Sequence, residues 1–280
     1  MGWRLRIVHQ TRVRYDGLAR ASYNEARMTP ATLPRQSPLE CQVSTDVPAA
    51  ISTYIDYWGT LVSAFDIQAP HHELVIRAQA TVETSSPLQP APPLEWSVLT
   101  ERAAEERLLE FLTPTRRTTV DQTLAATARQ RTADADPLEA AEDIASWVND
   151  RVAYVPGATG VQTSAQEAWD KGQGVCQDIA HLTVALLREA GLPARYVSGY
   201  LHPQPEAEPG DEVEGQSHAW VEYWTGEWVA CDPTNRAQVG EQHVVVAAGR
   251  DYGDVPPLKG IYHGAPGAAM DVIVAVTRLA

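Results

Sequence analysis

Cysteine is scarce in this sequence. Only three cysteines occur among the 280 residues, Cys41, Cys176 and Cys231, and none of them forms the close C-x-x-C pair of a zinc knuckle or redox dithiol. A chain of this length can bury enough apolar surface to fold without disulfide or metal crosslinks. The sequence therefore predicts no metal site, and each cysteine is by default a small buried hydrophobic residue.

Positive charge and long apolar runs are also lacking. The formal net charge is −14, which argues against a nucleic-acid groove or attachment to an anionic membrane. No stretch approaches the roughly 18 to 20 consecutive apolar residues of a membrane span. The first ten residues lack the apolar segment of a signal peptide. We therefore predict a cytoplasmic protein that binds peptides or small molecules, with no nucleic-acid or membrane partner.

Alternation of apolar and polar residues dominates the first third of the chain. Between Trp3 and Tyr15 the apolar side chains fall on one face and the arginines on the other, as in a half-buried strand. Further alternating stretches cover residues 23–28, 41–45, 51–58, 61–67 and 74–82. Together they predict an antiparallel β-sandwich or barrel domain over residues 1–90. The proline-rich stretch 85–93 then indicates a linker.

Helical sequence follows this linker. Residues 101–112 and 120–131 have helix-forming composition, and Asp136-Pro137-Leu138-Glu139 is a capping box with proline in the first turn. Another helix begins near Cys176 and ends at Gly191. Strands are expected at residues 194–200, 217–223, 227–231, 243–248 and 269–277, with a loop at 203–215. The predicted class is α+β, with a β domain (1–90), a helical connector (91–135) and a core with C-terminal strands (136–280).

Cys176 lies where a glycine-flanked turn becomes a helix. Its sulfur is expected to face unpaired backbone N–H groups and the positive end of the helix dipole, and both favour the thiolate. A structural cysteine would sit more naturally on the apolar stripe of Ile179, Leu182 and Leu186, which position 176 precedes. From this local context alone, nucleophile and buried structural residue remain alternatives.

A thiol nucleophile needs an imidazole as base and a third group that fixes the imidazole tautomer. His218 and Asp232 lie on the two strands of one expected hairpin, whose three-residue loop would have Gly226 in the left-handed region. If Tyr223 pairs with Glu227, then His218 lies directly opposite Asp232 and the two side chains share a face.

Four segments carry a family resemblance. They are Gly172-Gln173-Gly174-Val175-Cys176-Gln177-Asp178, Gly191-Leu192-Pro193-Ala194-Arg195-Tyr196-Val197-Ser198-Gly199-Tyr200, Ser217-His218-Ala219-Trp220-Val221-Glu222 and Asp232-Pro233-Thr234-Asn235. In this order they resemble the bacterial branch of the transglutaminase-like superfamily, and the first 90 residues resemble the N-terminal region often attached to it. The resemblance implies a papain-like core with Cys176, His218 and Asp232 as nucleophile, base and orienting carboxylate. It implies no cofactor, and the calcium sites of animal cross-linking enzymes are not visible.

Acyl transfer also requires donors to an oxyanion, and the backbone N–H of Cys176 is the first candidate. Tyr154 resembles a family position with an aromatic donor, although an ordinary core tyrosine is the alternative. Gln173, close before the thiol, is a second candidate. Trp220 and Asp178 are candidates for the substrate cleft, and for Trp220 simple cover of the sheet is the alternative. His181 is expected to point away from the thiol and to serve packing.

The sequence thus predicts a thiol-dependent acyl-transfer enzyme acting on amide bonds of peptides or related small amides. Hydrolysis through a thioester, as in a cysteine protease or amidase, is the first choice. The alternatives are an amine-accepting transglutaminase or peptide ligase, and a non-catalytic peptide-binding module that kept the fold. Neither the substrate nor the oligomeric state follows from the sequence.

Overall fold

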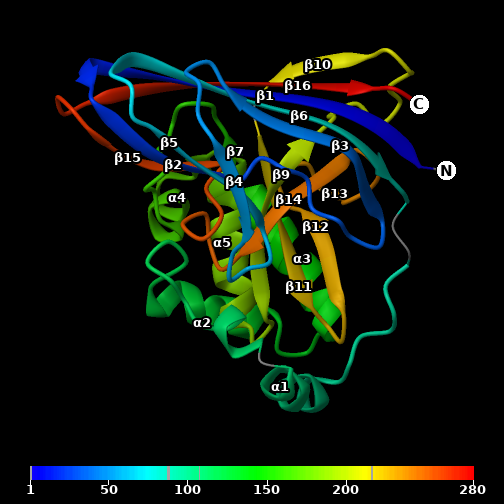
Figure 1. Ribbon diagram of the computed structural model, residues 1–280. Helices are drawn as coiled ribbons and strands as arrows, with labels where there is room; N and C mark the ends of the chain where they lie inside the picture. The colour runs from blue at the N-terminus through cyan, green and yellow to red at the C-terminus, as the bar shows by residue number, and fades with distance from the viewer. Residues whose placement is uncertain (1, 87–88, 107, 216) are drawn as a thin grey trace.

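The protein is described from a computed structural model that covers residues 2–86, 89–106, 108–215 and 217–280 (Figure 1). Positions 87–88 of the predicted linker and position 107 of the predicted helix 101–112 lie outside the described residues. The architecture is α+β, as the sequence predicted, with a strand-rich N-terminal part and a mixed core. None of the helices in the described ranges combines the length and apolar character of a bilayer crossing. The cytoplasmic location stays a prediction.

The N-terminal part is a sandwich of two antiparallel sheets. One sheet has the strand order β10 (Glu212–Gly215), β16 (Ala268–Arg278), β1 (Trp3–Ala19), β6 (His71–Thr84) and β3 (Gln36–Thr45). The other has the order β15 (Leu258–His263), β2 (Ala21–Ala26), β5 (Leu61–Ile67) and β4 (Ile51–Ile55). Phe65 of the second sheet and Ile76 of the first are both buried in the layer between them. Alternating apolar positions meet there, which accounts for the period of two in the sequence.

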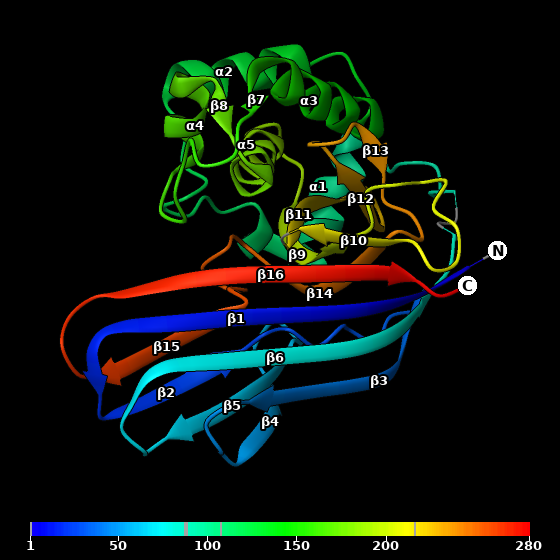
Figure 2. The ribbon, with the colours of Figure 1, turned by 90° about the horizontal axis from the view of Figure 1, so that it is seen from above.

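One face of the long strand β1 serves two cores. Near its start, Leu5 and Ile7 belong to the same hydrophobic cluster as the helical core, whereas Val13 belongs to the interior of the sandwich. Between them lies His9, whose Nδ1 is hydrogen-bonded to the hydroxyl of Tyr200 at 3.0 Å. Figure 2 shows β16, β1 and β6 running side by side, and Figure 1 shows the second sheet and the core both lying beneath them. The first sheet therefore contributes side chains to both hydrophobic cores.

The core has an antiparallel sheet of its own. Its order is β13 (Ala237–Gln238), β12 (Trp228–Asp232), β11 (His218–Trp224), β9 (Ala194–Leu201) and β14 (His243–Gly249). The helices are α1 (Trp96–Glu105), α2 (Gln122–Arg131), α3 (Pro137–Arg151), α4 (Ala165–Lys171) and α5 (Cys176–Glu189), with a 3₁₀ turn η1 (Leu108–Phe111). The short strands β7 (Ala153–Tyr154) and β8 (Gln173–Gly174) pair in parallel.

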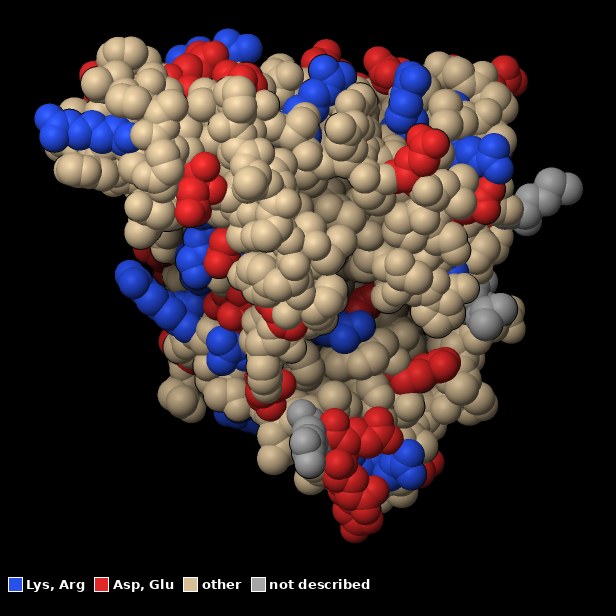
Figure 3. All heavy atoms as spheres, viewed as in Figure 1, with Lys and Arg blue, Asp and Glu red and all other residues tan. Residues whose placement is uncertain are grey.

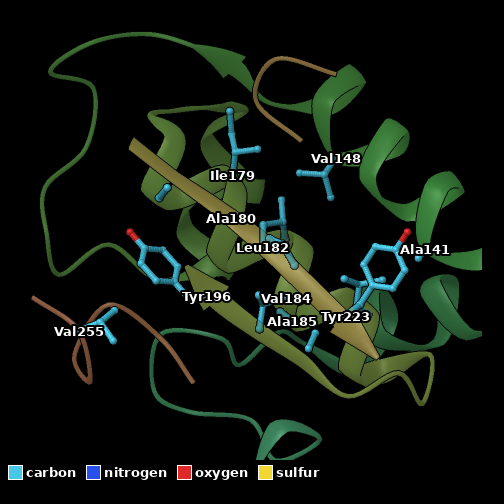
Figure 4. Close-up of a cluster of buried hydrophobic side chains, with 14 of the residues drawn as sticks. Ala141, Val148, Ile179, Ala180, Leu182, Val184, Ala185, Tyr196, Tyr223 and Val255 are labelled. Carbon is cyan, nitrogen blue, oxygen red and sulfur yellow. The ribbon is translucent and has the colours of Figure 1, made fainter. Parts of the chain in front are cut away.

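Helix α5 lies at the centre of this core. Its residues from Asp178 to Arg188 are all buried, and Figure 2 shows α2, α3 and α4 on one side of it and the sheet on the other. Figure 4 shows the packing of α5 residues with the sheet and α3, including Ile179, Leu182, Val184, Tyr196, Tyr223 and Val148. A helix buried all round is held rigidly, so the position of its first residue, Cys176, is well defined.

Several predicted elements are corrected. Strand β16 pairs with β1, from Leu5 opposite Arg278 to Tyr15 opposite Ala268, so the C-terminal strand belongs to the first sheet of the sandwich and not to the core 136–280. Strand β10 lies within the predicted loop 203–215, and β15 was not predicted. The predicted strand 51–58 ends at Ile55, and the predicted helix 101–112 is replaced by α1 and η1. Alternation identifies a strand but not the sheet that it joins, because partner choice depends on long-range packing.

Acidic side chains are spread over the face seen in Figure 3 and gather at its lower end. That end carries α1, the helix with Glu101 and Glu105, whose Arg102 pairs with Glu106 at 2.9 Å. The residues described below lie in the core, away from this cluster.

Candidate active site

Cys176 is the first residue of α5, as predicted. The turn before it is fixed by Asp178, whose Oδ2 accepts the Val175 N–H at 2.8 Å and the Thr159 hydroxyl at 2.5 Å. A Cβ at Gly174 would lie 2.8 Å from the Asp178 Cβ, so only glycine fits where the chain passes the helix start. The first N–H groups of a helix have no partner within it. The backbone N–H of Cys176 is therefore free to donate to a bound group.

His218 contacts both other members of the predicted set. Its Nε2 lies 2.7 Å from Asp232 Oδ2, within hydrogen-bonding distance, and the thiol of Cys176 is close enough to the ring to raise its pKa. Since Nε2 faces Asp232, Nδ1 is the nitrogen left for the sulfur. Burial lowers the pKa of His218, but the hydrogen bond to Asp232 and the interaction with Cys176 outweigh burial and raise the pKa to about 10.

The hairpin register differs from the prediction by one residue at each side of the loop. Trp224 pairs with Trp228, not Tyr223 with Glu227, and the loop is Thr225-Gly226-Glu227. Gly226 has φ +119°, and a Cβ there would lie 2.9 Å from the side chain of Leu94, so Leu94 packs closely against the loop. Val221 is opposite Cys231, which brings Asp232 level with Trp220. His218 and Asp232 are thus diagonal neighbours on one face rather than direct partners.

Asp232 is fully buried and surrounded by donors. Its Oδ1 accepts the backbone N–H groups of Thr234 at 3.0 Å and Asn235 at 3.3 Å. Its Oδ2 accepts from His218, from the Asn235 amide at 2.7 Å and from His243 Nε2 at 3.3 Å. Burial raises the pKa of Asp232, but hydrogen bonds from the two histidines outweigh burial and hold that pKa well below its usual range. The carboxylate is therefore ionised and fixed in orientation.

Helix α3 holds the turn that follows Asp232. The Asn149 side-chain amide donates to the carbonyls of Pro233 at 2.6 Å and Thr234 at 3.0 Å, and its oxygen accepts from Arg236. Arg236 has φ 50°, in the left-handed region that non-glycine residues seldom adopt. The sequence analysis did not find Asn149 or His243, because each reaches the turn from a distant segment and no local spacing marks it.

The comparisons with known proteins agree with this geometry. Residues 124–233 match the model of the transglutaminase-like superfamily, and residues 5–83 match that of the bacterial transglutaminase-like N-terminal region. An uncharacterised protein of Mycobacterium leprae is 46% identical over 99% of this chain and 100% of its own length. The chain belongs to the transglutaminase-like superfamily.

Two further matches concern members with descriptive names. The structure of a candidate cysteine protease from Cytophaga hutchinsonii superposes with a TM-score of 0.80 at 21% identity, covering 100% of this chain and 92% of the other. A protein-glutamine gamma-glutamyltransferase of Pseudomonas aeruginosa is 33% identical over 40% of this chain and 18% of its own length. The first likeness shows the fold, and the second covers less than half of this chain.

The predicted oxyanion donors of this transglutaminase-like protein lie on the strand pair beside Cys176. Tyr154 pairs with Gly174 and is 55% exposed, so it is not the core tyrosine of the alternative interpretation. Burial of part of its ring and the charge of Cys176 raise the pKa of Tyr154, which keeps its hydroxyl protonated. Gln173 pairs with Ala153 and is exposed. Their catalytic roles stay predictions.

The two cleft candidates are buried. Trp220 is 0% exposed, its ring stacks on His218 at a centroid distance of 6.1 Å, and the His243 ring meets it edge-on at 5.3 Å. Asp178 is also 0% exposed because it caps the start of α5. Neither side chain lines an open surface, so both cleft predictions are replaced: Trp220 supports the histidine rings, and Asp178 fixes the turn before Cys176.

His181 serves packing, as expected from its place on α5. It is fully buried, its ring lies 4.9 Å from that of Tyr196, and its Nε2 accepts the Tyr252 N–H at 3.0 Å. Tyr196 was missed by the sequence analysis. Burial and then the charge of Cys176 raise its pKa well above the usual value, so its phenol stays neutral on the sheet side of the thiol.

Two other features border the site. A groove of about 730 Å³ lies between α3 and β12, with Leu138, Glu142 and Cys231 among its lining residues, and it reaches Asp232 but neither Cys176 nor His218. His218, Asp232 and His243 also bring their ligand atoms within 4.8 Å of one another. Because Asp232 Oδ2 already accepts hydrogen bonds from both histidines, these three groups are satisfied as a hydrogen-bonded cluster.

Proposed function

We propose that this protein is a thiol-dependent acyl-transfer enzyme that hydrolyses amide bonds of peptides or related small amides through a thioester. One observation carries the proposal. A single imidazole, that of His218, is hydrogen-bonded to a buried carboxylate at 2.7 Å and interacts with a thiol at a helix N-terminus. This combination of base, orienting group and nucleophile is the one that thiol acyl transfer requires.

In the first half-reaction, Nδ1 of His218 carries the proton taken from the thiol, and Sγ of Cys176 attacks the amide carbonyl as the thiolate. The backbone N–H of Cys176 and the hydroxyl of Tyr154 donate to the oxyanion, with Gln173 as the alternative side-chain donor. The C–N bond breaks as His218 returns the proton to the departing amine. Asp232 stabilises the imidazolium that forms between these steps, because its carboxylate stays ionised.

In the second half-reaction, water attacks the thioester while His218 takes its proton. The C–S bond breaks, a carboxylic acid leaves, and the thiol of Cys176 is restored. If an amine replaces water, the product is a new amide. The partial likeness to the glutamyltransferase of Pseudomonas aeruginosa favours this transfer reaction as the second candidate. The likeness in fold to the candidate cysteine protease from Cytophaga hutchinsonii accords with hydrolysis.

A peptide library incubated with the protein, with and without added primary amines, separates the candidates by mass spectrometry. Hydrolysis predicts new carboxylate termini or deamidated side chains in both samples, and transfer predicts amine adducts in the second sample alone. Protein alkylated beforehand with iodoacetamide is the control. If the library stays unchanged and Cys176 is alkylated no faster than the exposed Cys41 at about pH 6, where an unpaired thiol is protonated, the protein is a binding module instead.

A further inference from the structure

Asp232 interacts with a second histidine besides His218. His243 begins β14 at one edge of the core sheet, whereas Asp232 ends β12 near the opposite edge. The connection 239–242 spans from β13 to β14 and brings the His243 ring against the carboxylate, with Nε2 3.3 Å from Oδ2. The His243 side chain is 1% exposed and that of Asp232 is 0% exposed. Both side chains are shielded from water, so neither group can replace this hydrogen bond with one to solvent.

The hydrogen bonds of His243 define its tautomer. Its Nδ1 accepts the backbone N–H of Gly240 at 3.2 Å, so this nitrogen carries no proton. The proton is then on Nε2, which donates to Asp232 Oδ2. Burial lowers the pKa of His243, against the opposing effect of its hydrogen bond to Asp232, and the ring stays neutral. His243 therefore donates a hydrogen bond to Asp232 as a neutral imidazole. A protonated His243 would instead compete with His218 for the negative charge of the carboxylate.

Two imidazoles therefore share one carboxylate oxygen. Nε2 of His218 and Nε2 of His243 both point to Oδ2, while Oδ1 is held by backbone N–H groups of the following turn. Trp220 lies against both rings and fixes the angle between them. With both oxygens engaged, the carboxylate cannot rotate away from His218.

We propose that His243 is a positioning residue, which holds the Asp232 carboxylate ionised and aimed at His218. This inference rests on the proposed function, because it assigns a task within the same thiol site. Without the Nε2 donor, Oδ2 keeps fewer hydrogen bonds, the carboxylate gains freedom to rotate, and the imidazolium of His218 is less stabilised beside the thiol.

Two substitutions of similar size test the proposal. His243→Gln keeps an N–H donor near the position of Nε2, and His243→Leu removes it. The readout is the rate of Cys176 alkylation by iodoacetamide across pH, which needs no substrate. His243→Leu is expected to lower the rate at about pH 6 by about tenfold, the effect of one hydrogen bond to a charged group. His243→Gln is expected to restore most of that loss.

The outcomes separate the two proposals. If the peptide library stays unchanged and the wild-type Cys176 reacts no faster than Cys41, the proposed function fails. If it reacts fast and the His243→Leu profile matches the wild type, or His243→Gln loses as much as His243→Leu, only the positioning role is overturned. Should His243→Leu not fold, ¹⁵N NMR of the histidines in the wild-type protein decides. We expect His243 to be a neutral Nε2–H tautomer at neutral pH, with its pKa lowered from the usual value of 6.5; an Nδ1–H tautomer, or a pKa that is not lowered, overturns the proposal.

Discussion

In the first sheet of the sandwich, charged side chains stand in pairs on the exposed face, such as Arg12 with Glu73 at 3.4 Å. In the core sheet, the carboxylate of Asp232 is fully buried and accepts hydrogen bonds at both of its oxygens. Exposed ion pairs contribute little to stability because water competes with them. A buried carboxylate, by contrast, persists only where donors replace the water that it has lost. We therefore expect substitutions inside the sandwich to change stability, and substitutions of the buried polar groups of the core to change the proposed activity.

The largest expected effect is on turnover. Cys176→Ala should abolish amide cleavage in the mass-spectrometric assay while the thermal unfolding midpoint changes little, because the thiol sits before the apolar stripe of α5. Cys41→Ser and Cys231→Ser are the matched controls and should stay active. Burial and then the charge of Asp232 raise the pKa of Cys231 to about 12, so this thiol is unsuited to attack. If Cys231→Ser folds but is inactive, the assignment of Cys176 as the nucleophile is wrong.

Asp232→Asn should have the next largest effect. The amide keeps the size of the side chain but loses the charge that stabilises the His218 imidazolium, so turnover should fall by roughly 10² to 10⁴. Steady-state kinetics at neutral pH measure this change. An unchanged rate would show that Asn235, which lies 3.4 Å from His218 Nε2, orients the imidazole instead.

Ile76→Ala tests the contribution of the N-terminal sandwich to stability. Ile76 is 0% exposed between the two sheets of the sandwich, so its truncation leaves a cavity and should cost about 2 to 5 kcal/mol of unfolding free energy. Turnover per folded molecule should not change. Urea denaturation gives the first quantity and active-site titration with iodoacetamide normalises the second. A loss of turnover in fully folded protein would mean that the sandwich takes part in the chemistry.

The smallest expected effect is a dependence of stability on alkaline pH. His218 has a pKa raised from 6.5 to about 10, so its contribution to stability is fully present below about 6.5 and is lost as the pH rises toward 10. Asp232 has the opposite sign, since a lowered pKa gives stability that is lost only in acid. The urea midpoint should therefore fall between about pH 6.5 and 9.5. His218→Gln should flatten this fall, and an identical slope in both proteins would contradict the pairing.

The sequence by itself determined those features that contiguous residues encode. The capping turn before Cys176 and the alternation in β1 are local, because each depends on neighbours within a few residues. The shared face of His218 and Asp232 was also predictable, since a register change of two residues leaves every side chain on the same face.

Only the tertiary structure decided which distant segments meet. It paired β16 with β1, buried Trp220 under the histidine rings, and brought His243 and Asn149 to the turn of Asp232. None of these contacts has a period or spacing in the chain, because they arise where separate elements pack and exclude water together. Local sequence pattern thus marked Cys176, His218 and Asp232, and tertiary packing decided which residues hold them in place.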